Sequence, residues 1–143
     1  MEKLKYYKIV IDGIDKTGKD LVKSYIWYVG KKRYLCYARG ILSEVAYAHL
    51  YNREVEYFVS KASEERIVNV MLIADKEDWE VRCKTTNEPA LDYEKQVEAF
   101  DYAKTALTGK LEHFIEINTS IHTPYQTAKI IVDYINKLNN LES

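Results

Sequence analysis

Glycine, proline and cysteine are all scarce in this sequence, which has 5 Gly, 2 Pro and 2 Cys among 143 residues. So little glycine and proline excludes collagen-like and low-complexity segments. Cys36 and Cys83 lie far apart and form no CxxC motif, which argues against a disulfide framework and a zinc site. No run of about 18 apolar residues occurs, and the first residues do not resemble a signal peptide. We therefore expect one domain over residues 1–143, in the cytoplasm and without a membrane partner.

Charge is balanced in total, with 21 Lys and Arg against 22 Asp and Glu, but it is uneven along the chain. Residues 1–40 hold ten basic and four acidic side chains, whereas residues 54–101 hold six basic and thirteen acidic ones. The basic part suits phosphorylated small molecules or nucleic acid. The acidic part argues against wrapping a polynucleotide, and its simplest interpretation is a solvated face.

Apolar patterns alternate between the strand and helix types along the whole chain. Four short apolar runs predict strands at 6–12, 33–37, 68–74 and 113–117, and helical periodicity predicts helices at 19–29, 41–53, 54–65 and 92–107, a short helix after Asp75 and a last helix after Thr123-Pro124. In the first helix, Leu21, Val22 and Ile26 fall on one predicted face. This order predicts an α/β fold in three layers, with a short, mainly parallel sheet of four to five strands covered by helices on both faces.

Ligands of such sheets bind beyond the carboxyl ends of the strands. The first strand ends in Gly13-Ile14-Asp15-Lys16-Thr17-Gly18-Lys19, which matches GxxxxGK, the first seven positions of the phosphate-binding P-loop. Converging loop N–H groups, a helix N-terminus and a mobile lysine all favour phosphate there. An ordinary βα turn with two glycines is the alternative. The location after a buried strand and before a helix favours a P-loop NTPase-like fold.

The next position, where the motif has Ser or Thr for Mg²⁺, is Asp20. A carboxylate would repel the outer phosphates unless a cation lies between them. Asp20 is therefore either a ligand of Mg²⁺, which accepts carboxylate oxygens, or a sign that metal-dependent transfer has been lost.

With these motifs the sequence resembles the thymidylate kinase-like P-loop kinases, particularly the small deoxynucleoside monophosphate kinases of bacteriophages. Four pieces carry the resemblance. They are the loop 13–19 (family GxDxxGKS), the segment Arg39 to Tyr47 continuing to Arg53 (family DRxxxSxxxY), the strand 70–73 followed by Glu80-Val81-Arg82, and Ile117-Asn118-Thr119-Ser120 with Thr123-Pro124.

The resemblance implies a kinase that transfers the γ-phosphoryl group of ATP, with Mg²⁺, to a (deoxy)nucleoside monophosphate. On the donor side, residues of the loop and of the last strand end would hold the triphosphate and approach the base: Gly13, Asp15, Lys16, Thr17, Gly18, Lys19, Asp20, Asn118 and Thr119. On the acceptor side, Asp15 would approach the sugar, Arg39 would clamp the monophosphate, and Ser43 and Tyr47 would line the pocket. Arg82 would neutralise charge on the transferred group.

Some of these residues also have ordinary structural interpretations. Arg39 could be an ordinary surface residue, because arginines are mostly exposed. Arg82 could form ordinary ion pairs with acidic neighbours on its own helix. Tyr47 and Tyr51 share a helix face and suit a core or an interface as well as base stacking.

Two family positions differ here: Ala38 replaces the aspartate before the arginine, and Asp20 replaces the Ser or Thr. Either Asp20 compensates for the missing carboxylate, or the chain is a catalytically impaired kinase-like domain that binds nucleotide or a protein partner. A plain NTPase is a weaker third option. Only about 20 residues separate Lys19 from Arg39. A second subunit is therefore a candidate to complete the acceptor side, and helices 19–29 and 41–53 suit a homodimer.

Overall fold

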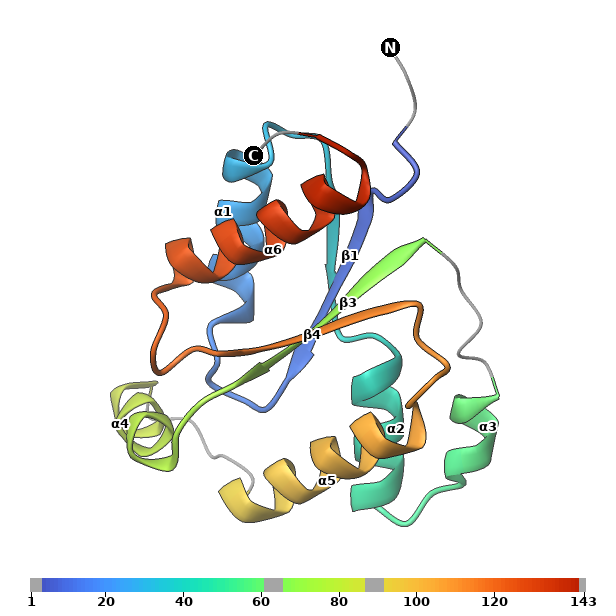
Figure 1. Ribbon diagram of the computed structural model, residues 1–143. Coiled ribbons are helices and arrows are strands. Elements are labelled where there is room, and N and C mark those ends of the chain that lie inside the picture. The colour runs from blue at the N-terminus through green and yellow to red at the C-terminus, as the bar shows by residue number, and fades with distance from the viewer. Residues whose placement is uncertain (1–3, 61–65, 87–91, 142–143) are drawn as a thin grey trace.

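The computed structural model describes residues 4–60, 66–86 and 92–141. Its elements follow one another as strands separated by one or two helices (Figure 1). They are β1 (Lys8–Gly13), α1 (Lys19–Val29), β2 (Leu35–Ala38), α2 (Ile41–Leu50), α3 (Val55–Val59), β3 (Ile67–Ile73), α4 (Lys76–Thr86), α5 (Tyr93–Ala106), β4 (His113–Asn118) and α6 (Pro124–Leu138).

The four strands in the described residues form one parallel sheet in the order β2-β1-β3-β4. In the register, Val10 of β1 lies opposite Tyr37 of β2 and Asn69 of β3. The two central strands are almost entirely buried, because both faces of a parallel sheet are covered. The predicted α/β fold with a short parallel sheet is confirmed.

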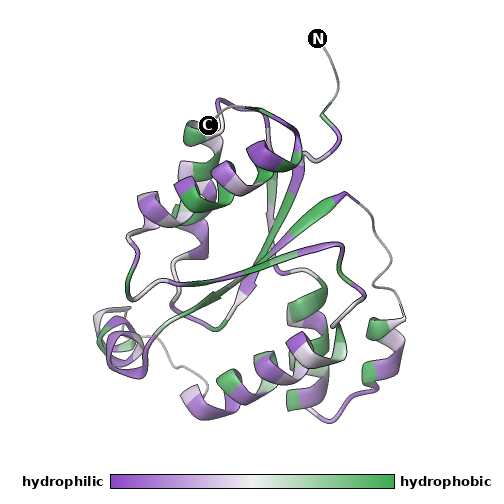
Figure 2. Ribbon diagram, in the orientation of Figure 1, coloured by the Kyte–Doolittle hydropathy of each residue, from purple (hydrophilic) through white to green (hydrophobic). Residues whose placement is uncertain are grey.

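Helices cover both faces of this sheet. α1 and α6 lie side by side on one face, and α2 and α5 lie on the other (Figure 1). The first face joins β-strand residues such as Ile9 and Val68 to Ile26 of α1 and Ile131 of α6. The second face packs side chains of α2 and α5, including Phe100, against the sheet. Figure 2 shows the central strands as mostly apolar, whereas the helices mix apolar and polar residues.

Local signals placed the end of α1 and the start of α6 correctly, with one side chain of α1 misassigned. α1 ends at Gly30, whose N–H bonds to Ile26 O, as its position in the sequence predicted. α6 begins with the predicted Thr123 N-cap. Leu21, however, is exposed and does not join the buried face. Val22 and Ile26 lie on the stripe of α1 that packs into the core formed with the sheet and α6, and Leu21 lies about 100° around the helix from Val22.

Several predicted boundaries also change. β2 begins at Leu35, two residues later than expected. α2 ends at Leu50, and two residues later Asn52 has a left-handed backbone conformation that stops the helix. The short helix expected after Asp75 becomes α4, which continues to Thr86, because no glycine or proline interrupts it before Pro89. α3 covers only Val55–Val59 of the predicted helix 54–65. Residues 61–65 and 87–91 lie outside the described residues.

The parallel arrangement brings the carboxyl ends of all four strands to one edge of the sheet. That edge therefore collects Gly13, Ala38, Ile73 and Asn118, each followed by a loop that leads to the next helix. No helix in the described ranges is long and apolar enough to span a membrane.

Candidate functional site

The loop between β1 and α1 has the backbone that the glycine spacing predicted. Gly13 has φ 144°, and a side chain there would collide with the backbone of Leu72 on β3. Gly18 has φ 78°, in the left-handed region that glycine adopts without steric cost, and it immediately precedes α1. The loop therefore leaves β1 tightly and presents the N-terminus of α1, where unpaired N–H groups favour an anion.

Lys19 folds back over this loop. Its Nζ donates to Gly13 O at 3.1 Å, to Ile14 O at 2.9 Å and to Thr17 Oγ1 at 3.4 Å. Burial lowers the pKa of Lys19 and the Arg39 guanidinium lowers it further, whereas three nearby carboxylates act in the opposite direction. Carbonyl oxygens of the loop thus hold the ammonium at the same cavity as a second cation, and a phosphate would relieve the repulsion between the two.

An open cavity of about 520 Å³ lies over the loop. Its lining is formed by the phosphate loop, the start of α1 and the end of β2: Asp15, Lys16, Thr17, Gly18, Lys19, Asp20, Leu21, Ala38 and Arg39. The structure therefore brings the two departures from the family pattern, Asp20 and Ala38, to the same cavity as the cationic Lys19 and Arg39.

Arg39 enters this site on an unusual backbone. Its φ is 65°, a left-handed conformation that costs energy in a residue with a side chain. Its N–H donates to Ile11 O at 2.9 Å, and the next N–H, of Gly40, donates to Asp12 Oδ1 at 2.6 Å. Neighbouring β1 thus fixes the turn that presents the arginine.

Asp12 is a residue of this site that the sequence reasoning missed. It is 0% exposed at the end of β1, and its Oδ1 accepts bonds from Gly40 N, from Ser43 N at 3.2 Å and from Ser43 Oγ. Its Oδ2 has no hydrogen-bond partner among the residues that the structure describes. Burial raises the pKa of Asp12, and the bonds from Ser43 and Gly40 oppose this rise. The sequence feature that could have identified Asp12 is a charged residue at the end of an otherwise apolar strand.

Gln96 of α5 was missed for a different reason. It is fully buried, and its Oε1 accepts the N–H of Asp15 at 2.9 Å. The helix containing Gln96 lies 81 positions away in sequence from the loop that it supports. No pattern near Gln96 indicated this contact, which only the docking of α5 creates.

The predicted acceptor residues lie on the α2 side of the loop. Ser43 is buried, with its hydroxyl engaged by Asp12. Tyr47 stacks with Tyr51 at 6.3 Å between ring centroids, as their shared helix face predicted. Burial raises the pKa of Tyr47, Asp15 raises it further and Arg39 lowers it.

Arg82 of α4 points to the loop from the other side. Its guanidinium donates to Lys16 O at 2.7 Å, to Thr119 Oγ1 at 3.1 Å and to Thr119 O at 3.2 Å. Lys16 has a left-handed φ of 63°, and this contact holds its carbonyl. Asn118 instead donates to Asp75 Oδ1 at 3.1 Å. Arg82 therefore contacts both Thr119 and the loop between β1 and α1.

The residues present fit a magnesium ion shared with a nucleotide. Asp20 is exposed in the first turn of α1, directly after Lys19. Within the described ranges, no group of three or more His, Cys, Asp or Glu side chains could hold a metal by itself. Mg²⁺ is commonly bound by one or two carboxylates together with substrate phosphates, so a single carboxylate at the cavity rim suits it.

Comparison with known proteins places this fold among solved structures. A scan against protein-family models and a search of curated proteins each found no match. Among solved structures, the chain is similar to the crystal structure of the YorR protein from Bacillus subtilis in complex with phosphorylated GDP. The TM-score is 0.71 at 13% sequence identity, over 95% of this chain and 99% of that chain. The chain therefore has the three-layer α/β fold of a protein that was crystallised with a nucleotide.

Proposed function

We propose that this protein is a P-loop nucleotide kinase that transfers the γ-phosphoryl group of ATP to a (deoxy)nucleoside monophosphate. The observation that carries the proposal is the pair of cations at one cavity. Lys19 follows the phosphate loop, and Arg39 follows the neighbouring strand on a strained, hydrogen-bonded turn. One cation suits the donor phosphates, and the other suits the acceptor phosphate.

On the donor side, the loop amides and Lys19 bind the triphosphate, and Asp20 provides the protein ligand for Mg²⁺. The bound ion supplies charge neutralisation at the outer phosphates. Thr119 and Asn118 lie at the end of β4, where the donor base is expected. Arg82 contacts Lys16 and Thr119, so it acts through the loop that it positions.

On the acceptor side, Arg39 holds the monophosphate, Asp15 approaches the sugar, and Ser43 and Tyr47 belong to the wall of the pocket. A phosphate oxygen of the acceptor forms a new bond to the γ-phosphorus as the bond from that phosphorus to the β–γ bridging oxygen breaks. ADP leaves with the bonding electrons. Positioning and charge neutralisation supply the catalysis, because the reaction needs little covalent help from the protein.

The similarity to a nucleotide-bound protein supports nucleotide binding by this chain. The bound molecule of that neighbour is a guanine nucleotide, so the first assay should test GTP as well as ATP as the phosphate donor. We also propose that residues 1–143 act as one unit without a polynucleotide partner. A homodimer that completes the acceptor side is a further prediction, which sedimentation with and without substrates tests.

The test of the proposed function is nucleoside diphosphate formation from ATP or GTP with Mg²⁺ and each common deoxynucleoside monophosphate. We expect turnover with at least one acceptor. Arg39→Ala should lower kcat/KM for the acceptor by at least about 100-fold, because a charged hydrogen bond is worth about 1.5–3 kcal/mol and Arg39 offers two, about 3–6 kcal/mol together. The matched control is Arg66→Ala, an exposed arginine at the opposite end of the sheet.

The second candidate is an impaired kinase-like domain that binds nucleotide or a protein. The observation that favours it is Ala38, which leaves the end of β2 without the family carboxylate in the cavity that holds Asp20. Asp20→Ala and Asp20→Ser separate the two functions. If Asp20 compensates, the alanine variant loses Mg²⁺-dependent transfer and the serine variant keeps part of it. Nucleotide binding that depends on Lys19, without transfer to any acceptor, would establish the impaired domain.

A further inference from the structure

β2 is the outer strand of the sheet, and its free edge is unusually accessible. On the inner side, Leu35 N donates to Tyr7 O at 2.8 Å and Arg39 N donates to Ile11 O at 2.9 Å. Backbone groups of successive strand residues point to opposite edges, so those of Cys36 and Ala38 point away from β1. Within the described residues, no strand pairs with this outer edge. The edge therefore offers two N–H and two C=O groups.

The strand has few of the features that usually protect an edge. Its sequence, Leu-Cys-Tyr-Ala, has no charge and no proline, and only its shortness limits pairing. Leu35 is 44% exposed and Tyr37 is 49% exposed, both on the same side of the strand. An additional strand would cover these two apolar side chains as well as the backbone groups.

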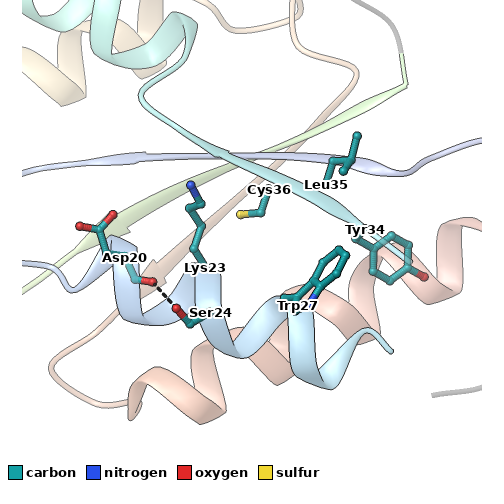
Figure 3. A pocket seen from close by; sticks show the side chains of 7 residues that line it. All are labelled: Asp20, Lys23, Ser24, Trp27, Tyr34, Leu35 and Cys36. Atoms are coloured by element: carbon teal, nitrogen blue, oxygen red, sulfur yellow. Dashed lines mark hydrogen bonds between the residues drawn. The ribbon is translucent and has the colours of Figure 1, made fainter. Parts of the chain in front are cut away.

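On the other side of β2, a groove of about 580 Å³ runs between the strand and α1. Its walls include Lys23 and Trp27 of α1, and Cys36 of β2. In Figure 3, Lys23 and Trp27 extend from α1 toward the strand, and Leu35, which also lines the groove, extends away from α1. Trp27 is 49% exposed, and burial raises the pKa of Cys36 to about 12, so the thiol is a neutral, apolar part of the wall.

The charges around this edge are mainly positive. Lys23 lies in the groove, and the turn that leads from α1 into β2 carries Lys31, Lys32 and Arg33. Asp20 is the one acidic side chain in the described lining of the groove. Two copies of this edge would bring like charges together, whereas an acidic segment would be attracted.

We propose that the β2 edge binds an extended segment of a partner protein in which acidic and apolar side chains alternate. The segment adds a fifth strand beside β2. Its backbone pairs with Cys36 and Ala38, one of its faces packs on Leu35 and Tyr37, and the other enters the groove beside Trp27. Its carboxylates meet Lys23 and the basic turn. Strand addition gives affinity through main-chain bonds, and the pockets for alternate side chains give specificity.

The test uses the whole protein and an acetylated peptide in which valine alternates with glutamate. Trp27 fluorescence reports occupancy, since the other tryptophan, Trp79, is buried. Amide hydrogen exchange reports pairing: the amides of Cys36 and Ala38 should become protected, whereas that of Leu35, already bonded to Tyr7, should not change. Rising salt should weaken the binding.

Two variants and two peptides decide the outcome. Lys23→Glu should weaken binding by about tenfold, and the matched change Lys110→Glu, at a distant exposed lysine, should not. A peptide with lysine in place of glutamate, or with N-methylated backbone, should not bind, and neither control depends on refolding of a variant. Equal binding of the acidic and basic peptides, or no protection of Cys36 and Ala38, would overturn the proposal. Concentration-dependent protection of these amides without peptide would assign the edge to a second copy of the chain instead.

Discussion

Ser43→Ala is the sharpest test of the buried carboxylate that holds the Arg39 turn. The change removes one hydroxyl that donates to Asp12 Oδ1, while the N–H groups of Gly40 and Ser43 stay in place. Both side chains are buried, so water does not replace the lost bond easily. The cost of the substitution should therefore depend on whether Asp12 is charged.

The magnitude follows from the two kinds of hydrogen bond. A bond between neutral groups contributes about 1 kcal/mol to stability, and a bond to a charged group contributes about 1.5–3 kcal/mol. Burial raises the pKa of Asp12 in the folded state. Protonation of Asp12 therefore stabilises the folded state. This stabilisation is fully present below the pKa that Asp12 has in the unfolded chain, and it is lost as pH rises through the higher pKa that Asp12 has in the folded state. The Ser43 hydroxyl bond lowers this pKa, so it stabilises the charged form of Asp12 more than the neutral form. The loss of unfolding free energy caused by Ser43→Ala should therefore grow from about 1 to about 2 kcal/mol as pH rises through the same interval.

The assay is denaturant unfolding of both proteins from about pH 4 to about pH 8, followed by tryptophan fluorescence. The same pair is then compared in an Asp12→Asn background, where residue 12 cannot titrate and the cost of Ser43→Ala should stay flat. Ser24→Ala is the control, because Ser24 is exposed and its hydroxyl donates to the helix carbonyl of Asp20. A pH-independent cost with Asp12 present, or the same pH dependence in the Asp12→Asn background, would refute the reasoning.

Three further predictions concern the phosphate loop. Lys19→Met should weaken ATP binding by about 10- to 100-fold, the value of one charged hydrogen bond, whereas Lys23→Met should not; calorimetric titration measures both. Gln96→Leu removes the acceptor for the Asp15 amide and should destabilise the fold by about 1 kcal/mol in urea unfolding, with weaker nucleotide binding. Arg82→Ala should speed hydrogen exchange across the loop, and unchanged exchange would exclude its positioning role.

Much of the architecture was predictable because its signals are local. The apolar run before Gly13, the two loop glycines and the helical periodicity after Lys19 lie within a few residues of one another. Their interactions are mostly backbone geometry, which neighbouring residues control. The errors at Leu21 and at the start of β2 have a non-local cause, because the burial of a side chain and the extent of strand pairing depend on which helix or strand packs alongside.

The sequence by itself determined the alternation of strands and helices, the two-glycine loop between the first strand and the first helix, and the polar residues at the carboxyl ends of the strands. Only the tertiary structure decided how these pieces meet. It placed Asp12 under the amides of Gly40 and Ser43, Gln96 against the loop, and Arg82 on Lys16, across separations of 28 to 81 residues. It also left β2 as the outer strand. Such contacts depend on strand order and helix docking, which arise from the packing of the whole core and leave no trace in any short stretch of sequence.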